Sequence, residues 1–132
     1  MSAQQALLRA VHQHLTQDAA LMAEVGSDGI RDRVLPRMQL PAIVYGTIES
    51  RDYSTATEPG EEHLATIEVW AEGEGRARAL EIAARVKALL HAASLPLSDA
   101  HLVSIVCTGM TSRRDKETRL SVIELRFRAV TE

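Results

Sequence analysis

Histidine is the residue type in this chain with the widest chemical range, since imidazole binds metal ions and transfers protons near neutral pH. His12 and His14 are two positions apart on an expected helix, so their side chains point about 200° away from each other and cannot hold one ion together. His63 and His101 each precede an expected strand, and His91 lies near an expected helix end. No cysteine or carboxylate cluster at ligand spacing completes a site, and we expect no metal site.

Nucleophiles and phosphate-binding turns are no better supported. Cys107 shares the alternation of Val103 and Ile105 on an expected strand, which predicts a buried, inert thiol. The Ser and Thr residues of "DYSTATEPG" have no base at a recognisable offset. "EGEGRARAL" resembles the start of a phosphate-cradling turn, but it lacks a third glycine and its two glutamates would repel phosphate. We expect no catalytic residue and no cofactor site.

Length and composition predict one ordinary globular domain, residues 1–132. The chain is 45 % hydrophobic and 25 % charged, with a net charge of -3, which argues against autonomous nucleic-acid binding. Its single cysteine suits a reducing compartment. We see no signal peptide and no apolar run near the ~20 residues of a membrane span. We expect a soluble, intracellular protein when it is made.

Periodicity places seven elements that could position functional residues. Ser2 can cap a helix with an apolar stripe, a second short helix is expected in 17–26 with Gly26 at its end, and 27–41 is expected to be an irregular connector. Strands are expected in "AIVYGTIES" and "EHLATIEVWA", joined by a polar connector at 51–61. A long amphipathic helix follows in 74–93. Two more strands, 101–110 and 119–130, are joined by the hairpin tip "TSRRDKET".

This order, ααββαββ, predicts an α+β two-layer sandwich: a four-stranded, mainly antiparallel sheet with helices on one face. A strand order of 1-2-4-3 makes every pair of neighbours antiparallel and puts the last strand in the middle. On that strand Ile123, Leu125 and Phe127 alternate with charged residues, as expected for a sheet with one buried face. Glu68 is expected to pair with Arg126 across the sheet.

The other face of the predicted sheet mixes apolar and charged residues. Leu64 and Trp70 share the parity of Glu62 and Glu68. That composition is typical of a surface that meets another protein. The alternative is that Trp70 covers a local depression within a single subunit.

Charge is unevenly distributed along the chain. Residues 49–74 contain eight acids and one arginine, a net charge of -7, whereas residues 111–128 contain six bases and three acids, a net charge of +3. A basic hairpin tip and a mobile acidic arm on one subunit favour head-to-tail contact between copies, which makes a ring if it closes. The alternative is two solvated loops with incidental charges.

Nearly the whole chain resembles the small tail terminator (tail completion) proteins of siphophage-like tails, especially those of the gene transfer agents of alphaproteobacteria. The segments that carry the resemblance best are "DYSTATEPGEEH", "EVWAEGEGRARALEIAARV" and "LRFRAVTE". None of them is a catalytic motif, so the resemblance lies in the overall pattern.

The resemblance implies a structural, non-enzymatic virion protein that caps the tail tube as a homohexameric ring, stops tube polymerisation and offers a docking face to the head connector or stopper protein. DNA would pass through the lumen without sequence-specific binding. The protein would be assembled in the bacterial cytoplasm and then stay at the head–tail junction of the particle. Candidate contact residues with other subunits, tail or head are Asp52, Tyr53, Ser54, Thr55, Glu58, Glu61, Glu62, Trp70, Arg113, Arg114 and Lys116.

Two other classes stay open on the sequence. One is a small α/β ligand-binding domain without a virion role, in which the mixed sheet face covers a pocket. The other is a hydrolase or transferase that uses Cys107 or the hydroxyls of the polar connector.

Overall fold

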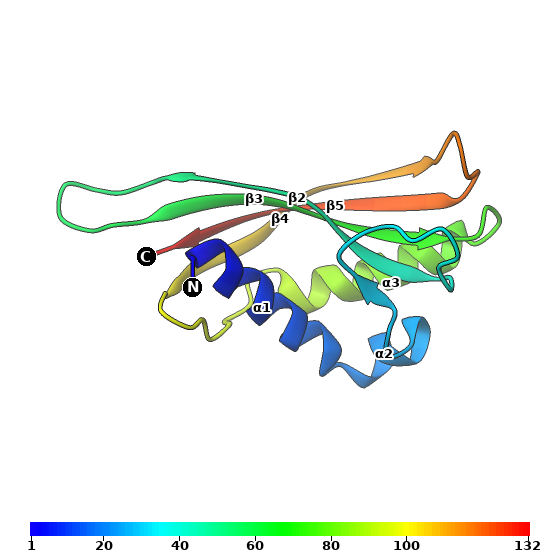
Figure 1. The fold of residues 1–132 in the computed structure, drawn as a ribbon, viewed down its shortest axis with the longest axis horizontal. Coiled ribbons are helices and arrows are strands. Elements are labelled where there is room, and N and C mark those ends of the chain that lie inside the picture. The colour runs from blue at the N-terminus through cyan, green and yellow to red at the C-terminus, as the bar shows by residue number, and fades with distance from the viewer.

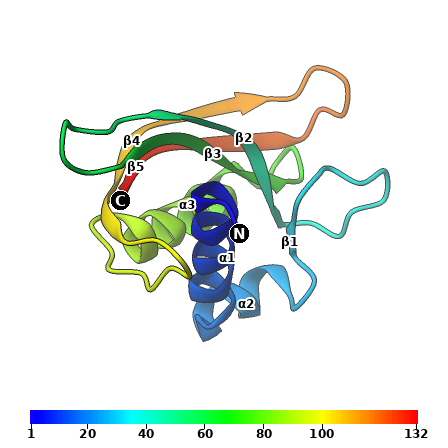
Figure 2. The ribbon, with the colours of Figure 1, turned by 60° about the vertical axis from the view of Figure 1, so that its left-hand side comes forward.

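The fold has two layers, a sheet of five strands and three helices that all cover one of its faces (Figure 1, Figure 2). The computed structural model describes residues 1–132. The elements are α1 (Ala3–Thr16), α2 (Ala19–Val25), β1 (Ile30–Arg31), β2 (Ala42–Asp52), β3 (Glu61–Ala71), α3 (Arg76–Leu90), β4 (Leu102–Arg114) and β5 (Ser121–Thr131). The predicted two-layer arrangement with helices on one face is confirmed.

The sheet has the order β1-β2-β3-β5-β4, with every neighbour antiparallel except β1 and β2. The last strand therefore lies between β3 and β4, as the sequence predicts. The predicted count of four strands is wrong. Ile30 and Arg31, which lie inside the expected connector, form a fifth strand that pairs in parallel with Ile43 and Val44. A strand of two residues is too short to show any alternation, so periodicity could not reveal it.

Local sequence signals set the helix ends. The Ser2 side chain accepts the Gln5 backbone N–H and the Gln5 side chain accepts the Ser2 backbone N–H, a reciprocal capping box at the start of α1. Gly26 ends α2 at a φ of 82°, a conformation that favours glycine. On α3 the buried residues recur at helical spacing, as predicted: Ala79, Ile82, Ala83, Val86 and Leu90.

The main core lies between the helices and the sheet. Ile123, Leu125 and Phe127 of β5 point into it, and the helical stripes cover them. A smaller cluster lies on the opposite face of the sheet, where Val44, Trp70 and Val122 are covered by Met38 and Leu40 of the segment that joins β1 to β2. We call this opposite face, which carries no helix, the bare face.

Two hairpins form the ends of the molecule's long axis (Figure 1). β2 and β4 continue further toward their hairpin ends than predicted: the β2–β3 loop spans only 53–60, and the β4–β5 turn spans only 115–120. Strand pairing continues into polar sequence, which hydrophobic alternation does not detect. Arg113 and Arg114 therefore belong to β4, and only Lys116 of the three predicted tip bases lies in the turn.

Candidate functional surfaces

The β2–β3 hairpin carries an acidic end, which we define as residues 52–61 and call the acidic tip. Its loop is closed by backbone bonds from the Tyr53 N–H to the Gly60 carbonyl (2.8 Å) and from the Thr55 N–H to the Glu58 carbonyl (2.9 Å). The Ser54 hydroxyl donates to Asp52 Oδ1 at 2.6 Å. The polar connector, expected to be a mobile arm, is thus a hydrogen-bonded hairpin end whose side chains lie almost entirely in solvent.

Glu62, adjacent to the acidic tip, differs from its neighbours. It is only 4 % exposed and lies on the bare face between two arginines. Arg128 Nε donates to Glu62 Oε2 at 2.5 Å, and Arg51 Nε donates to Glu62 Oε1. These bonds from Arg128 and Arg51 hold the pKa of Glu62 below its usual value. Glu62 has little surface left to offer a partner, so its effect on any contact would act through the two arginines.

The β4–β5 hairpin carries the basic end, residues 113–119, which we call the basic tip. Arg113 lies 3.6 Å from Glu68 and 3.7 Å from Asp115, so part of its charge is balanced within the subunit. Arg114 Nη2 donates to the Gly73 carbonyl at 3.1 Å. Lys116 is exposed and forms no ion pair within 4 Å. Glu68 therefore pairs with Arg113 and not with Arg126, which contacts Glu124 and Thr111 instead.

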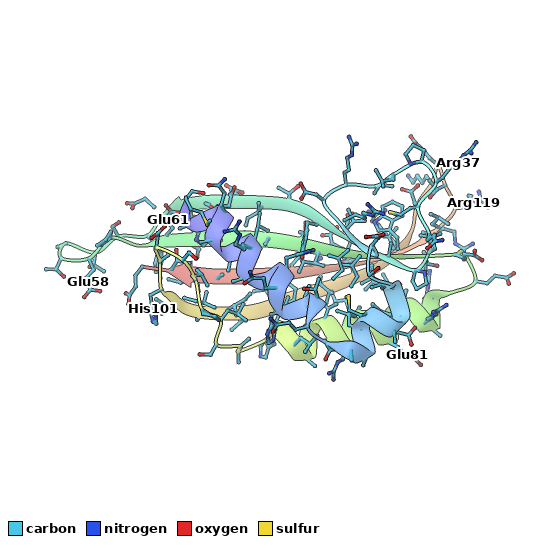
Figure 3. The ribbon with its side chains drawn as sticks, turned by 60° about the horizontal axis from the view of Figure 1, so that its bottom comes forward. Arg37, Glu58, Glu61, Glu81, His101 and Arg119 are labelled. Carbon is cyan, nitrogen blue, oxygen red and sulfur yellow. The ribbon has the colours of Figure 1, made fainter.

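The acidic and basic tips lie at opposite ends of the molecule. Glu58 and Glu61 project at one end, and Arg119 projects at the other (Figure 3). Residues 48–61 contain four carboxylates and one arginine, a formal charge of -3. Residues 109–120 contain four bases and two acids, a formal charge of +2. The chain thus presents unlike charges at its two ends.

Among the predicted contact residues, Trp70 has the largest apolar side chain, and this residue is only 6 % exposed. Val44, Val122, Met38 and Leu40 surround it, and its indole N–H donates to Glu68 Oε1 at 3.1 Å. The alternative weighed for Trp70, that it fills a depression within one subunit, describes this environment. Of the apolar side chains predicted on this face, Leu64 is the exposed one, at 44 %.

A buried histidine has the most enzyme-like surroundings. His63 is 0 % exposed; its Nδ1 lies 2.6 Å from the Ser50 hydroxyl and its Nε2 lies 2.9 Å from the Thr131 hydroxyl. Burial lowers the pKa of His63, and nearby Glu61 acts in the opposite direction. Both ring nitrogens are occupied by hydroxyls, so the ring orders the ends of β2, β3 and β5. Sequence reasoning missed this role because the two partners, Ser50 and Thr131, lie 13 and 68 positions away along the chain.

The thiol that the enzyme alternative invokes has no base beside it. Cys107 is half-buried, and its Sγ contacts the Gly109 carbonyl at 3.6 Å. The nearest histidine is His91, whose Nδ1 accepts the Cys107 backbone N–H at 3.0 Å and does not contact the sulfur. No three His, Cys, Asp or Glu side chains are arranged to hold a metal ion.

A small apolar cavity lies between α1 and the sheet. Leu7, Val11, Ile48 and Phe127 are among the apolar residues that line it, and its volume is about 20 Å³. This is space for about one water molecule, whereas small-molecule sites span roughly 300–1,000 Å³. An open surface groove of about 650 Å³ runs beside α1, lined by Arg9, His12, Asp32 and Tyr45 among others. None of the helices has both the length and the apolar composition needed to cross a membrane.

These features define a class: a two-layer α+β domain whose distinctive surfaces are two oppositely charged hairpin ends and a sheet face patterned with ion pairs. Comparisons with known proteins then place it. The model of the family "Tail completion protein gp17" matches residues 9–132, and the chain belongs to this family.

A solved structure gives a close relative. The chain is similar to a chain of the structure described as "Virion of native gene transfer agent (GTA) particle", with 32 % sequence identity and a TM-score of 0.89. The match covers 99 % of this chain and 98 % of that chain. A search of curated proteins finds no match. The resemblance predicted from the sequence is confirmed.

Proposed function

We propose that the chain is a structural protein of a phage-like particle that caps the tail tube as a homohexameric ring. The ring ends polymerisation of the tube protein and provides the docking surface for the head connector or stopper protein, and DNA passes through its lumen. The observation that carries the proposal is the near full-length similarity to a chain of a gene transfer agent virion. The proposed ring forms in the bacterial cytoplasm and then stays at the head–tail junction.

The charge distribution supports head-to-tail contact between copies. A contact between two different surfaces of identical subunits is heterologous, and it closes into a ring when the rotation between neighbours is right. The acidic and basic tips are two such surfaces, because they lie at opposite ends of one rigid sheet. Asp52 would lie on one side of the contact and Arg113 on the other, and Glu58, Glu61 and Lys116 would flank it.

The proposed role does not require any covalent bond to be made or broken. Ser50, His63 and Thr131 are joined in a buried polar cluster, and the Cys107 thiol contacts a backbone carbonyl. Each group therefore has a structural partner, which supports a non-enzymatic protein.

Electron microscopy of particles from host cells that lack this chain tests the proposal. We expect tails of irregular length that are not joined to heads, and we expect the purified protein to restore a ring of density at one end of isolated tubes. Tails of normal length and normal joining in the absence of the chain would overturn the proposal.

A further inference from the structure

Both edges of the sheet contain a stretch without a backbone partner. On β2, pairing with β1 is confined to Ile43 and Val44, and no backbone hydrogen bond reaches the outer side of residues 48–52. On β4, the outer side is covered at Ile105 by the Ala92 N–H and at Cys107 by His91, and residues 109–114 beyond them are uncovered. Each stretch begins just after a β-bulge and is exposed or half-exposed.

The loops reveal which backbone groups point outward. In an antiparallel pair, residues alternate between bonding the neighbouring strand and pointing away from it. The bond from the Tyr53 N–H to the Gly60 carbonyl sets this alternation on β2, so the backbone groups of Ile48, Ser50 and Asp52 point outward. The Gln4 side chain donates to the Ile48 carbonyl at 3.5 Å, which agrees with this direction.

The same reasoning applies to β4. The Asp115 N–H bonds to the Leu120 carbonyl at 2.8 Å, so residues 113 and 111 bond to β5. The backbone groups of Met110, Ser112 and Arg114 then point away from the sheet. Each edge therefore presents three residues spaced two apart that have no backbone partner, and the two sets can face each other; on β2 the Gln4 side chain contacts the first of them.

We propose that residues 48–52 of one copy pair antiparallel with residues 109–114 of the next copy, with Ser50 opposite Ser112, so that one sheet continues into the other. This inference rests on the proposed ring and names the contact that builds it. Addition of a strand to a free edge is a common mode of recognition. An uncovered edge of this length also invites unwanted pairing unless the assembly covers it.

Charge selects the register. With Ser50 opposite Ser112, Glu49 lies opposite Arg113 on the bare face, an unlike pair at the closest type of cross-strand position. A shift of two residues in one direction puts Arg51 opposite Arg113 and Glu49 opposite Asp115, which are two like-charge pairs. A shift in the other direction leaves Glu49 opposite Thr111, without a charge partner. The proposed partner is a second copy because both halves of this match occur on one chain.

Disulfide trapping in assembled particles tests the pairing. In the proposed register residues 49 and 113 form a pair that is not hydrogen-bonded, with Cα atoms roughly 4.5 Å apart, which suits a disulfide. Within one subunit they lie on β2 and β4, separated by β3 and β5, so only a bond between copies can form. The test variant carries Glu49→Cys, Arg113→Cys and Cys107→Ser. The matched control keeps Arg113 and carries Glu117→Cys instead, at an exposed turn position, with the other two substitutions unchanged.

Particles that contain the test variant should give a ladder of covalent multimers on non-reducing gels, and the control should not. Incorporation without a ladder, or equal ladders from both variants, would overturn the edge pairing and leave the proposed function standing. Normal tails from particles that lack the chain would overturn both.

Proline gives an independent test without cysteines. The outward Ser112 N–H has no partner within the subunit, so Ser112→Pro should keep the melting temperature of Ser112→Ala while its incorporation into particles is lost. Normal incorporation of a folded Ser112→Pro protein would contradict the pairing.

Discussion

Glu62 and Arg128 face each other diagonally across β3 and β5, and Arg128 Nε donates to Glu62 Oε2 at 2.5 Å. Arg51 on β2 donates to the other carboxylate oxygen, so a single carboxylate links three neighbouring strands. The Arg128 guanidinium also lies 5.5 Å from the centroid of the Tyr53 ring, at the root of the acidic tip. This cluster holds the projecting hairpin to the body of the sheet.

Glu62→Gln should lower the melting temperature at pH 7 more than Glu61→Gln, since residue 62 is the buried partner of two arginines and the side chain of residue 61 is 45 % exposed. The pKa of Glu62 is lowered from 4.5, so its contribution is present above pH 4.5 and is lost as pH falls through the folded value. Thermal unfolding at pH 7 and pH 3 should therefore differ less in the variant. An equal effect of both substitutions at pH 7 would contradict this role.

His63 should make the subunit sensitive to mild acid. Its folded pKa is lowered from 6.5 by burial, so the unfolded chain binds a proton more readily and stability decreases as pH falls below 6.5. The His63→Gln variant, measured by chemical denaturation between pH 7 and pH 5, should have a flatter profile even if it is less stable throughout. His101→Gln is the exposed control and should keep the wild-type slope.

The acidic tip should contribute to assembly and little to folding. Replacing residues 54–59 by Asn-Gly leaves the Tyr53–Gly60 pair as the end of a two-residue hairpin. Because loop-closure entropy varies slowly with length, the free energy of unfolding should change by about 1 kcal/mol or less. Incorporation into particles should decrease. A large loss of stability in chemical denaturation would show that the loop is part of the folded core.

Charge reversal at the basic tip is best tested in the turn, at Lys116 and Arg119. Arg113 and Arg114 have partners within the subunit, so their reversal would perturb the fold as well as any contact. Lys116→Glu together with Arg119→Glu should leave the melting temperature nearly unchanged and reduce incorporation into particles. Lys87→Glu, on the exposed side of α3, is the control. Normal incorporation of the double variant would remove the charge-docking hypothesis.

Trp70 should matter for the stability of the single subunit. Trp70→Ala removes the centre of the small cluster on the bare face and should cost about 3–5 kcal/mol, measured by chemical denaturation. Trp70→Phe keeps most of the apolar volume and should cost less. A Trp70→Ala protein with wild-type stability but no incorporation would instead support a direct contact role.

Hydrophobic alternation predicted most of the fold. Ile123, Leu125 and Phe127 face the helices as expected, and the stripe on α3 is the one predicted. Alternation failed where apolar residues stop but backbone pairing continues, which is why both hairpin loops are shorter than predicted. The two-residue β1 left no pattern at all. These limits are physical, because a ladder of backbone hydrogen bonds requires no apolar side chain.

The candidate surfaces were only partly predictable. The acidic and basic hairpins follow from charge counts, and the structure adds that they lie at opposite ends. The burial of Glu62 and Trp70 depends on residues distant in sequence: Arg128 covers one, and Met38 and Leu40 cover the other. The pairing of Glu68 with Arg113, where Arg126 was expected, depends on register, which composition does not fix.

The position of β5 has a consequence for synthesis. β5 is the last of the strands along the chain, yet it lies between β3 and β4 and contributes side chains to the core. A nascent polypeptide interrupted before Ser121 would hold a hairpin and a detached strand with nothing to connect them. Such a fragment would lack the central strand of the sheet and its core residues, so it should be far less stable than the full chain.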